Sequence, residues 1–287
     1  MRTLDETAAA ILEPPKGMLV LDEYAEALVP AGRFTEAVLR AEGLNDHISA
    51  VLLTAEAFAT LHPSGTEPLV GVRMTMSEPD LAELARSGAS FVEWRENLSP
   101  LDVPRGGVHV GVEALARGAA EAQAEGILPV LTIAMPDLGA SSIQVNQAVT
   151  TNALLALRDE IDRAGVNPRH LLLRINMVVP GISNPVTADS EEVARRTVGL
   201  LEKGVPAETP GVLLLSGGQP LDQACMYLEA VASDPGHPWR VTFAFSRSLI
   251  AAAASAWVQD GEWERILLQS CRRASQSVAL VSNGAAS

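Results

Sequence analysis

Short apolar runs alternate with longer mixed segments along the whole chain. The runs are rich in leucine and β-branched residues, and most of them are apolar at nearly every position. Continuous apolar runs of this length are typical of parallel strands that are buried on both faces. The runs lie at 17–22, 49–54, 69–74, 91–96, 127–133, 171–177, 211–217 and 240–246.

Segments between these runs have the apolar spacing of helices. Apolar residues recur at intervals of three and four, and the clearest segments, 78–88, 111–126 and 190–204, contain or end on a closing glycine, a common helix stop. Eight strands that alternate with helices predict a single-domain α/β fold, a (β/α)8 TIM barrel over 1–280 with a short flexible tail at 281–287. The alternative is an open doubly wound sheet, but no glycine-rich dinucleotide motif follows the first strand.

Polar residues end or interrupt the apolar runs, at the edge where barrels of this kind carry their chemistry. Charged side chains in such strands are costly to bury unless they are paired. Two interpretations stay open: an internal network of ion pairs, or a ligand site. Three arginines against two carboxylates leave an excess of positive charge, which suits an anion. The charged residues are Asp22, Arg73, Glu93, Arg95 and Arg174.

A second signal is the segment "LLLSGGQP", in which a strand runs into Ser216, Gly217 and Gly218. Backbone N–H groups of such a turn can hold a phosphate, and the loops after strands seven and eight of many barrels do so. Ser246 and Arg247, at the end of the next strand, add a hydroxyl and a fixed cation. Together these segments predict a phosphate site, to which we also assign Arg73.

Composition excludes several classes of partner. The net charge of −14 argues against nucleic acid and against anionic membrane surfaces. Two cysteines and scattered histidines offer neither a disulfide framework nor metal-ligand spacing, so we expect no metal and no cofactor. No run has the length of a membrane span, and a cytoplasmic soluble protein is expected. The only lysines are Lys16 and Lys203.

Taken together, the strand ends resemble those of the class I fructose-1,6-bisphosphate aldolases. The likeness runs through nearly the whole chain, although this chain is shorter than typical members. The matching segments occur in the family's order: "EPPKGMLVLDEY", "FVEWRENL", "LLLRINMVVPG", "GVLLLSGGQPLDQA" and "HPWRVTFAFSRSLIAAAASAW". The resemblance implies a sugar-phosphate ligand and, since the family is often tetrameric, a homo-oligomer.

Residue by residue, the resemblance divides the site in two. It implies phosphate binding by Ser216, Gly217, Gly218, Ser246 and Arg247, and it matches Arg33, in "PAGRF", to an arginine that holds the far phosphate. The active-site positions of Asp22 and Arg95 are also matched. In the catalytic half, however, Arg174 stands where the family has its Schiff-base lysine, and Glu93 stands where a lysine precedes a Trp-Arg pair. Thr132 and Ala134 align with two glutamates.

These differences lead to two hypotheses. In the first, the chain is an enzyme without a Schiff base, a lyase or isomerase that acts on a phosphorylated carbonyl substrate with Asp22 and Glu93 as acid and base and with Arg95 and Arg174 stabilising an enolate. In the second, it is a catalytically inactive relative that senses or scaffolds a phosphorylated metabolite. The state of Glu93 distinguishes them: a carboxylate locked in a bidentate pair with Arg174 favours the second, and one that points into an open pocket favours the first.

Overall fold

The computed structural model describes residues 2–21, 32–63, 68–75, 80–101, 110–136 and 138–282. Within these residues, eight parallel strands close into a barrel in sequence order, with β8 paired to β1. The strands are β1 (Gly17–Leu21), β2 (Ile48–Thr54), β3 (Leu69–Arg73), β4 (Phe91–Asn97), β5 (Leu128–Ala134), β6 (Leu172–Asn176), β7 (Gly211–Leu215) and β8 (Arg240–Phe245). The predicted TIM barrel is confirmed, and each strand begins and ends within two residues of its predicted bounds.

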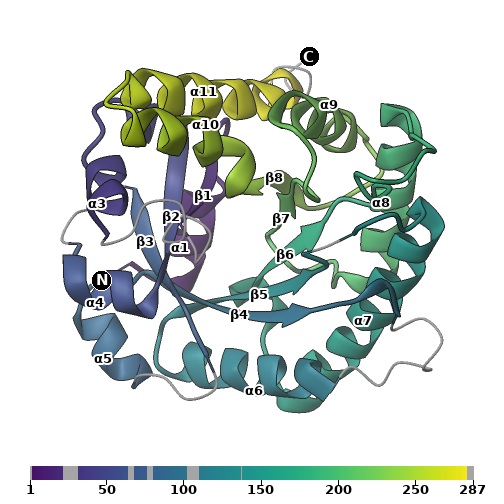
Figure 1. Cartoon of the computed structure of the whole chain (residues 1–287). Helices are drawn as coiled ribbons and strands as arrows, with labels where there is room; N and C mark the ends of the chain where they lie inside the picture. Colours follow the sequence, from purple (N-terminus) through teal and green to yellow (C-terminus); the bar gives the residue numbers. More distant parts are fainter. Residues whose placement is uncertain are drawn as a thin grey trace.

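Helices surround the barrel as an outer ring (Figure 1). Helix α8 illustrates why they form where they do, because Asp189 caps its first turn by accepting from Glu192 N. Helix α11 continues to Ser282, two residues into the predicted tail, and 283–287 lie outside the described residues. The helices are α1 (Leu4–Ile11), α3 (Arg33–Leu39), α4 (Ala55–Leu61), α5 (Leu81–Arg86), α6 (Val110–Ala124), α7 (Ile143–Ala164), α8 (Ser190–Gly204), α9 (Leu221–Ala232), α10 (Arg247–Val258) and α11 (Trp263–Ser282).

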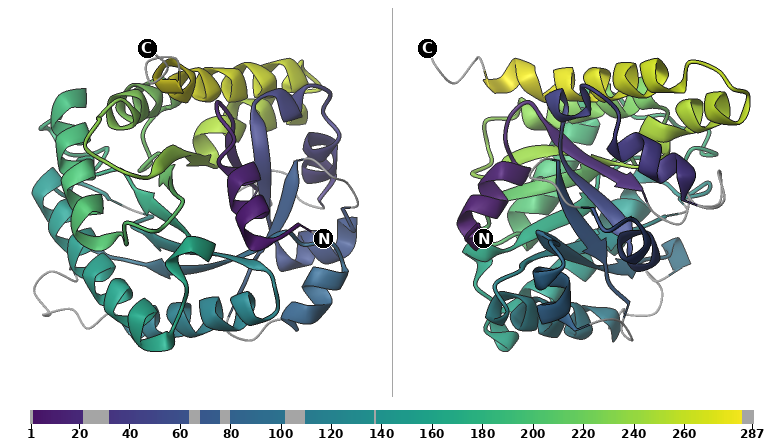
Figure 2. Two further views of the ribbon diagram at one scale, coloured as in Figure 1. Left: turned by 180° about the vertical axis from the view of Figure 1, so that it is seen from behind. Right: turned by 90° about the vertical axis from the view of Figure 1, so that its left-hand side faces the viewer.

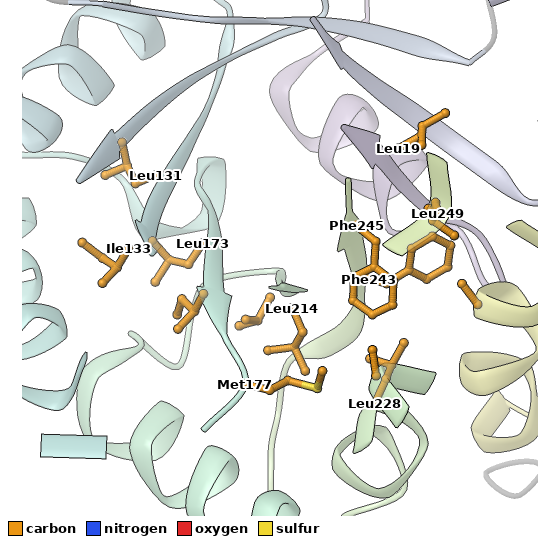
Figure 3. Close-up of a cluster of buried hydrophobic side chains, with 14 of the residues drawn as sticks. Leu19, Leu131, Ile133, Leu173, Met177, Leu214, Leu228, Phe243, Phe245 and Leu249 are labelled. Atoms are coloured by element: carbon orange, nitrogen blue, oxygen red, sulfur yellow. The ribbon is translucent and has the colours of Figure 1, made fainter. Parts of the chain in front are cut away.

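The layer between barrel and helices forms the larger core. Outward-facing side chains of the strands pack against the helices, as Phe243 and Phe245 of β8 do near Leu228 of α9 and Leu249 of α10 (Figure 3). The two phenylalanine rings lie 5.5 Å apart between centroids. Alternation along each strand therefore sends one set of side chains to this core and the other set into the barrel.

The barrel interior is apolar at one end and polar at the other. Its lower part is filled by residues such as Val130 and Phe91, whose ring occupies the space that the absent side chain of Gly71 leaves. Helix α1, which precedes β1, packs on this lower layer through Ala8 and Ile11 and lies across that mouth of the barrel (Figure 2). One end is thereby closed, and the site lies at the other.

Candidate functional site

A cavity of about 250 Å³ opens at the carboxyl ends of the strands in the second half of the barrel. Inward-facing positions of β4 to β8 and the loops after β7 and β8 form its wall, which is where barrel enzymes carry their chemistry. Its polar lining residues are Arg95, Arg174, Asn176, Ser216, Ser246 and Arg247. Most of the residues that the sequence predicts for a phosphate site therefore come together in one place.

The turn after β7 forms one side of the cavity. Gly217 and Gly218 have φ angles of +64° and +78°, in the left-handed region that glycine adopts without strain. A Cβ on Gly217 would lie 2.7 Å from Cγ2 of Val179, and a Cβ on Gly218 would lie 3.3 Å from Nη2 of Arg247. Glycine is required here both by conformation and by the close approach of the arginine.

Arg247 reaches this turn from the neighbouring strand end. It is the first residue of α10, a helix of 12 residues that starts directly after Ser246. The amino end of a helix carries partial positive charge and unpaired N–H groups, which favour an anion. A glycine turn, a guanidinium group and a helix terminus thus converge, and such a set of groups suits a phosphate.

Beneath the cavity, Glu93 is fully buried and holds three neighbours. Its Oε2 accepts from Nε of Arg73 at 2.7 Å. Its Oε1 accepts from Nη1 of Arg174 at 2.7 Å and from Oγ1 of Thr132 at 2.6 Å. The register brings them together, because Arg73 pairs with Glu93 between β3 and β4, and Thr132 pairs with Arg174 between β5 and β6.

The network fixes the charge of each member. Burial alone would raise the pKa of Glu93, but the charges of Arg73 and Arg174, together with hydrogen bonds from Arg73 and Thr132, outweigh it and lower the pKa to about 2. Burial lowers the pKa of Arg174 to about 10 against the opposing effect of Glu93. At neutral pH Glu93 is an anion and Arg174 a cation, and Glu93 is not among the residues that line the cavity.

Asn176, a polar residue of the sixth apolar run to which no role was assigned from the sequence, also lines the cavity. Its Oδ1 accepts from Met135 N at 2.9 Å, and its side chain is almost entirely buried. It lies two residues after Arg174 on β6, and strand alternation turns both to the barrel interior. The two-residue spacing from Arg174 was therefore the sequence signal that Asn176 faces the barrel interior.

Two predicted site residues, Arg73 and Arg33, lie elsewhere. Arg73 belongs to the network around Glu93, and Arg33 is the exposed first residue of α3. Neither lines the cavity. Asp22, which follows β1 directly, lies outside the described residues.

The two lysines are both remote from the cavity. Lys16 precedes β1 at the closed end of the barrel, where its Nζ donates to Glu13, and Lys203 is in the last turn of α8. Within the described parts of the chain, no group of three or more histidine, cysteine, aspartate or glutamate residues could hold a metal ion. None of the described helices combines the length and the apolar character of a membrane span.

Comparisons with known proteins agree with this architecture. A family model described as fructose-bisphosphate aldolase class-I matches residues 74–282. A probable fructose-bisphosphate aldolase class 1 of Xanthomonas axonopodis pv. citri is 28% identical over 90% of each chain. Fructose-bisphosphate aldolase B of Gallus gallus is 32% identical over 74% of this chain and 61% of its own. The structure of fructose-bisphosphate aldolase from Plasmodium falciparum, in complex with TRAP and a small molecule inhibitor, superposes with a TM-score of 0.80 at 23% identity, covering 96% of this chain and 94% of that one.

Proposed function

This chain belongs to the class I fructose-bisphosphate aldolase family, and we propose that it binds a small phosphorylated metabolite in the cavity at the ends of β4 to β8, as a sensor or scaffold and without imine chemistry. Phosphate recognition is assigned to the glycine turn, Ser216, Ser246 and Arg247. The network around Glu93 is assigned a structural task, which is to hold Arg174 in place under the ligand.

The engagement of Glu93 carries this proposal. A general base must reach a proton of the substrate and have a pKa near the working pH. Glu93 is fully buried, its two oxygens accept from three donors, and its pKa of about 2 makes it a very weak base. The predicted bidentate pair with Arg174 is not formed, because Arg73 holds the second oxygen. The carboxylate nevertheless does not line the cavity, which favours binding over proton abstraction.

The chemistry of Arg174 supports the same proposal. An imine requires a neutral amine with a lone pair, and a guanidinium group does not supply one. Arg174 stays protonated at neutral pH, and neither Lys16 nor Lys203 lines the cavity. The family's covalent route would therefore have no nucleophile in this cavity.

Two matched variants, one at each end of β8, test whether Arg247 binds the phosphate. Arg247 lies at the cavity, whereas Arg240 is exposed at the opposite end of β8. In isothermal titration calorimetry with glycerol 3-phosphate, Arg247→Ala is expected to weaken binding at least ten-fold, since a charged hydrogen bond contributes about 1.5–3 kcal/mol. Arg240→Ala should bind as the wild type does. Equal affinities of all three proteins would overturn the proposal.

A second candidate function is an imine-free lyase or isomerase. It is favoured by the guanidinium groups of Arg95 and Arg174 in the cavity lining, which suit a developing enolate oxygen. Its base would then be Asp22. Dihydroxyacetone phosphate is incubated with the protein in D₂O and followed by proton NMR. Deuterium uptake that disappears in Asp22→Asn would select this candidate, and no uptake despite binding would select the sensor or scaffold.

Self-association and a cytoplasmic location stay predictions that rest on family resemblance and composition. The first is tested by size-exclusion chromatography with light scattering. A mass near 30.2 kDa would identify a monomer and contradict the predicted homo-oligomer.

A further inference from the structure

Two buried polar side chains of β6 face the cavity with donors that the described residues leave unused. Only 2% of Arg174 and 3% of Asn176 is exposed, and both line the cavity. Oδ1 of Asn176 accepts from Met135 N, and no described residue accepts from its Nδ2. Nη1 of Arg174 donates to Glu93, and Nη2 donates to Ala244 O over a long 3.5 Å. No described residue accepts from its Nε.

Buried donors without acceptors are costly, by about 1–3 kcal/mol each, and such groups are rare in folded proteins. Nε of Arg174 has almost no accessible surface, so a ligand oxygen in the cavity would accept from Nδ2 of Asn176 and meet the charge of Arg174, not that Nε. The two residues occupy positions i and i+2 of one strand, so that they present their polar groups on the same face. They form one recognition surface, here named the β6 donor pair.

The β6 donor pair lies next to the phosphate cradle. Nδ2 of Asn176 is 3.7 Å from the point where a Cβ on Gly217 would lie. The cavity is about 250 Å³, below the 300–1,000 Å³ that pockets for drug-sized ligands occupy. With a phosphate held by Gly217, Gly218 and Arg247, a short carbon skeleton fits between it and the donor pair.

The charges around the donor pair favour an anionic end group. The trio of Arg73, Glu93 and Arg174 contains two cations and one anion. Among the residues that the structure describes, every charged lining residue of the cavity is an arginine. Hydroxyl groups need acceptors for their protons as well as donors, and this lining is poor in charged acceptors. A carboxylate needs donors only.

We propose that the ligand is a short phosphorylated carboxylic acid, with its phosphate on the cradle of Gly217, Gly218 and Arg247 and its carboxylate on the β6 donor pair. This inference rests on the proposed phosphate-binding function and names its ligand class. A ketone would offer the donor pair one neutral oxygen, whereas a carboxylate offers two oxygens that share a negative charge. Hydrogen bonds to ionised acceptors are about twice as strong as neutral ones.

Three probes with the same three-carbon skeleton and one phosphate test the ligand class. Glycerol 3-phosphate has only hydroxyls beyond the phosphate, dihydroxyacetone phosphate has a ketone, and 3-phosphoglycerate has a carboxylate. Titration calorimetry is expected to show 3-phosphoglycerate binding at least ten-fold more tightly than either of the others. Equal affinities, or tightest binding of the ketone, would overturn the inference and leave the phosphate site in place. Failure of all three to bind would overturn the proposed function itself.

Asn176→Asp tests whether the β6 donor pair causes the preference for 3-phosphoglycerate. Aspartate keeps an oxygen for Met135 N and replaces the Nδ2 donor with an acceptor, so the preference for 3-phosphoglycerate over glycerol 3-phosphate is expected to disappear. Asn167→Asp is the control, because it adds the same charge at the cap that precedes η3 (Pro168–His170), at the other end of β6. A preference that survives in Asn176→Asp, in protein whose circular dichroism melts as the wild type does, would overturn the assignment.

Should Asn176→Asp unfold, Asn176→Ser is the second variant. Serine is small and neutral, and it cannot extend a donor as far as the amide of asparagine. The ratio of the affinity for 3-phosphoglycerate to that for glycerol 3-phosphate is again expected to fall toward one. An unchanged ratio would overturn the role of Asn176.

Discussion

Nη1 of Arg174 lies 2.7 Å from Oε1 of Glu93, and both side chains are almost completely buried in the barrel. The other carboxylate oxygen holds Arg73, also at 2.7 Å. One anion thus stabilises two buried cations, and the three charges depend on one another. A buried pair that loses one partner leaves an uncompensated charge, which is far more costly than the loss of a surface ion pair.

Glu93→Gln is therefore expected to destabilise the fold strongly. Glutamine keeps the size of the side chain but removes the anion with which both Arg73 and Arg174 pair. The expected loss in the free energy of unfolding is about 3–5 kcal/mol, measured by urea denaturation at pH 7.

Thr132→Val is the matched control for this network. It removes one hydrogen bond to Glu93, at 2.6 Å, and leaves both ion pairs in place. The expected loss in the free energy of unfolding is about 1–2 kcal/mol. If Glu93→Gln cost no more than Thr132→Val, the ion pairs would not be the main support of the barrel interior.

The low pKa of Glu93 predicts how stability changes with pH. The pKa falls from 4.5 to about 2 on folding, so the folded state binds fewer protons. The stabilisation from Glu93 is fully present above pH 4.5 and is lost as pH falls toward 2. It amounts to about 3 kcal/mol.

Comparison of the wild type with Glu93→Gln isolates this contribution from other carboxylates. Urea unfolding of both proteins is measured between pH 7 and pH 3. The difference between their free energies of unfolding is expected to be constant above pH 4.5 and to shrink below it. A difference that stayed constant down to pH 3 would mean that the pKa of Glu93 changes little on folding.

The fold could be predicted from the sequence because strands that are buried on both faces leave continuous apolar runs, and eight such runs lead to a closed barrel. The meeting of Gly217, Gly218 and Arg247 at one cavity was also predictable, since they lie at consecutive strand ends. The partners of Glu93 were not, because they depend on the register between β3, β4, β5 and β6. Asn176 belongs to the polar residues of the sixth apolar run, but no role could be assigned to it, because an asparagine there does not tell whether its amide caps the backbone or faces a cavity.

The glycine turn gives a prediction about the phosphate site alone. Gly218→Ala places a methyl group 3.3 Å from Nη2 of Arg247, at a φ of +78° that alanine adopts only with strain of about 1–2 kcal/mol. Arg247 must shift, and the affinity for glycerol 3-phosphate is expected to fall at least ten-fold in calorimetry.

Gly165→Ala is the control for backbone strain. Gly165 also has a positive φ, +70°, and a Cβ there would meet no atom within 4 Å. It is expected to lower stability by a similar amount and to leave the affinity unchanged. If both variants bound glycerol 3-phosphate equally, the contact between Gly218 and Arg247 would not shape the site.

The absence of imine chemistry is the last prediction. Sodium borohydride reduces an imine to a stable amine. Because imine formation releases water and reduction adds two hydrogens, a protein that forms one with dihydroxyacetone phosphate gains the mass of the triose phosphate less one oxygen. Arg174 has no amine lone pair, and Lys16 and Lys203 lie away from the cavity. Intact-mass spectrometry of the treated protein is expected to show no adduct, while a class I aldolase with its Schiff-base lysine, treated in parallel, shows one. An adduct that peptide mapping places on Lys16 or Lys203, and that excess glycerol 3-phosphate prevents, would mean that a lysine reaches the phosphate site after all and would overturn the proposed function.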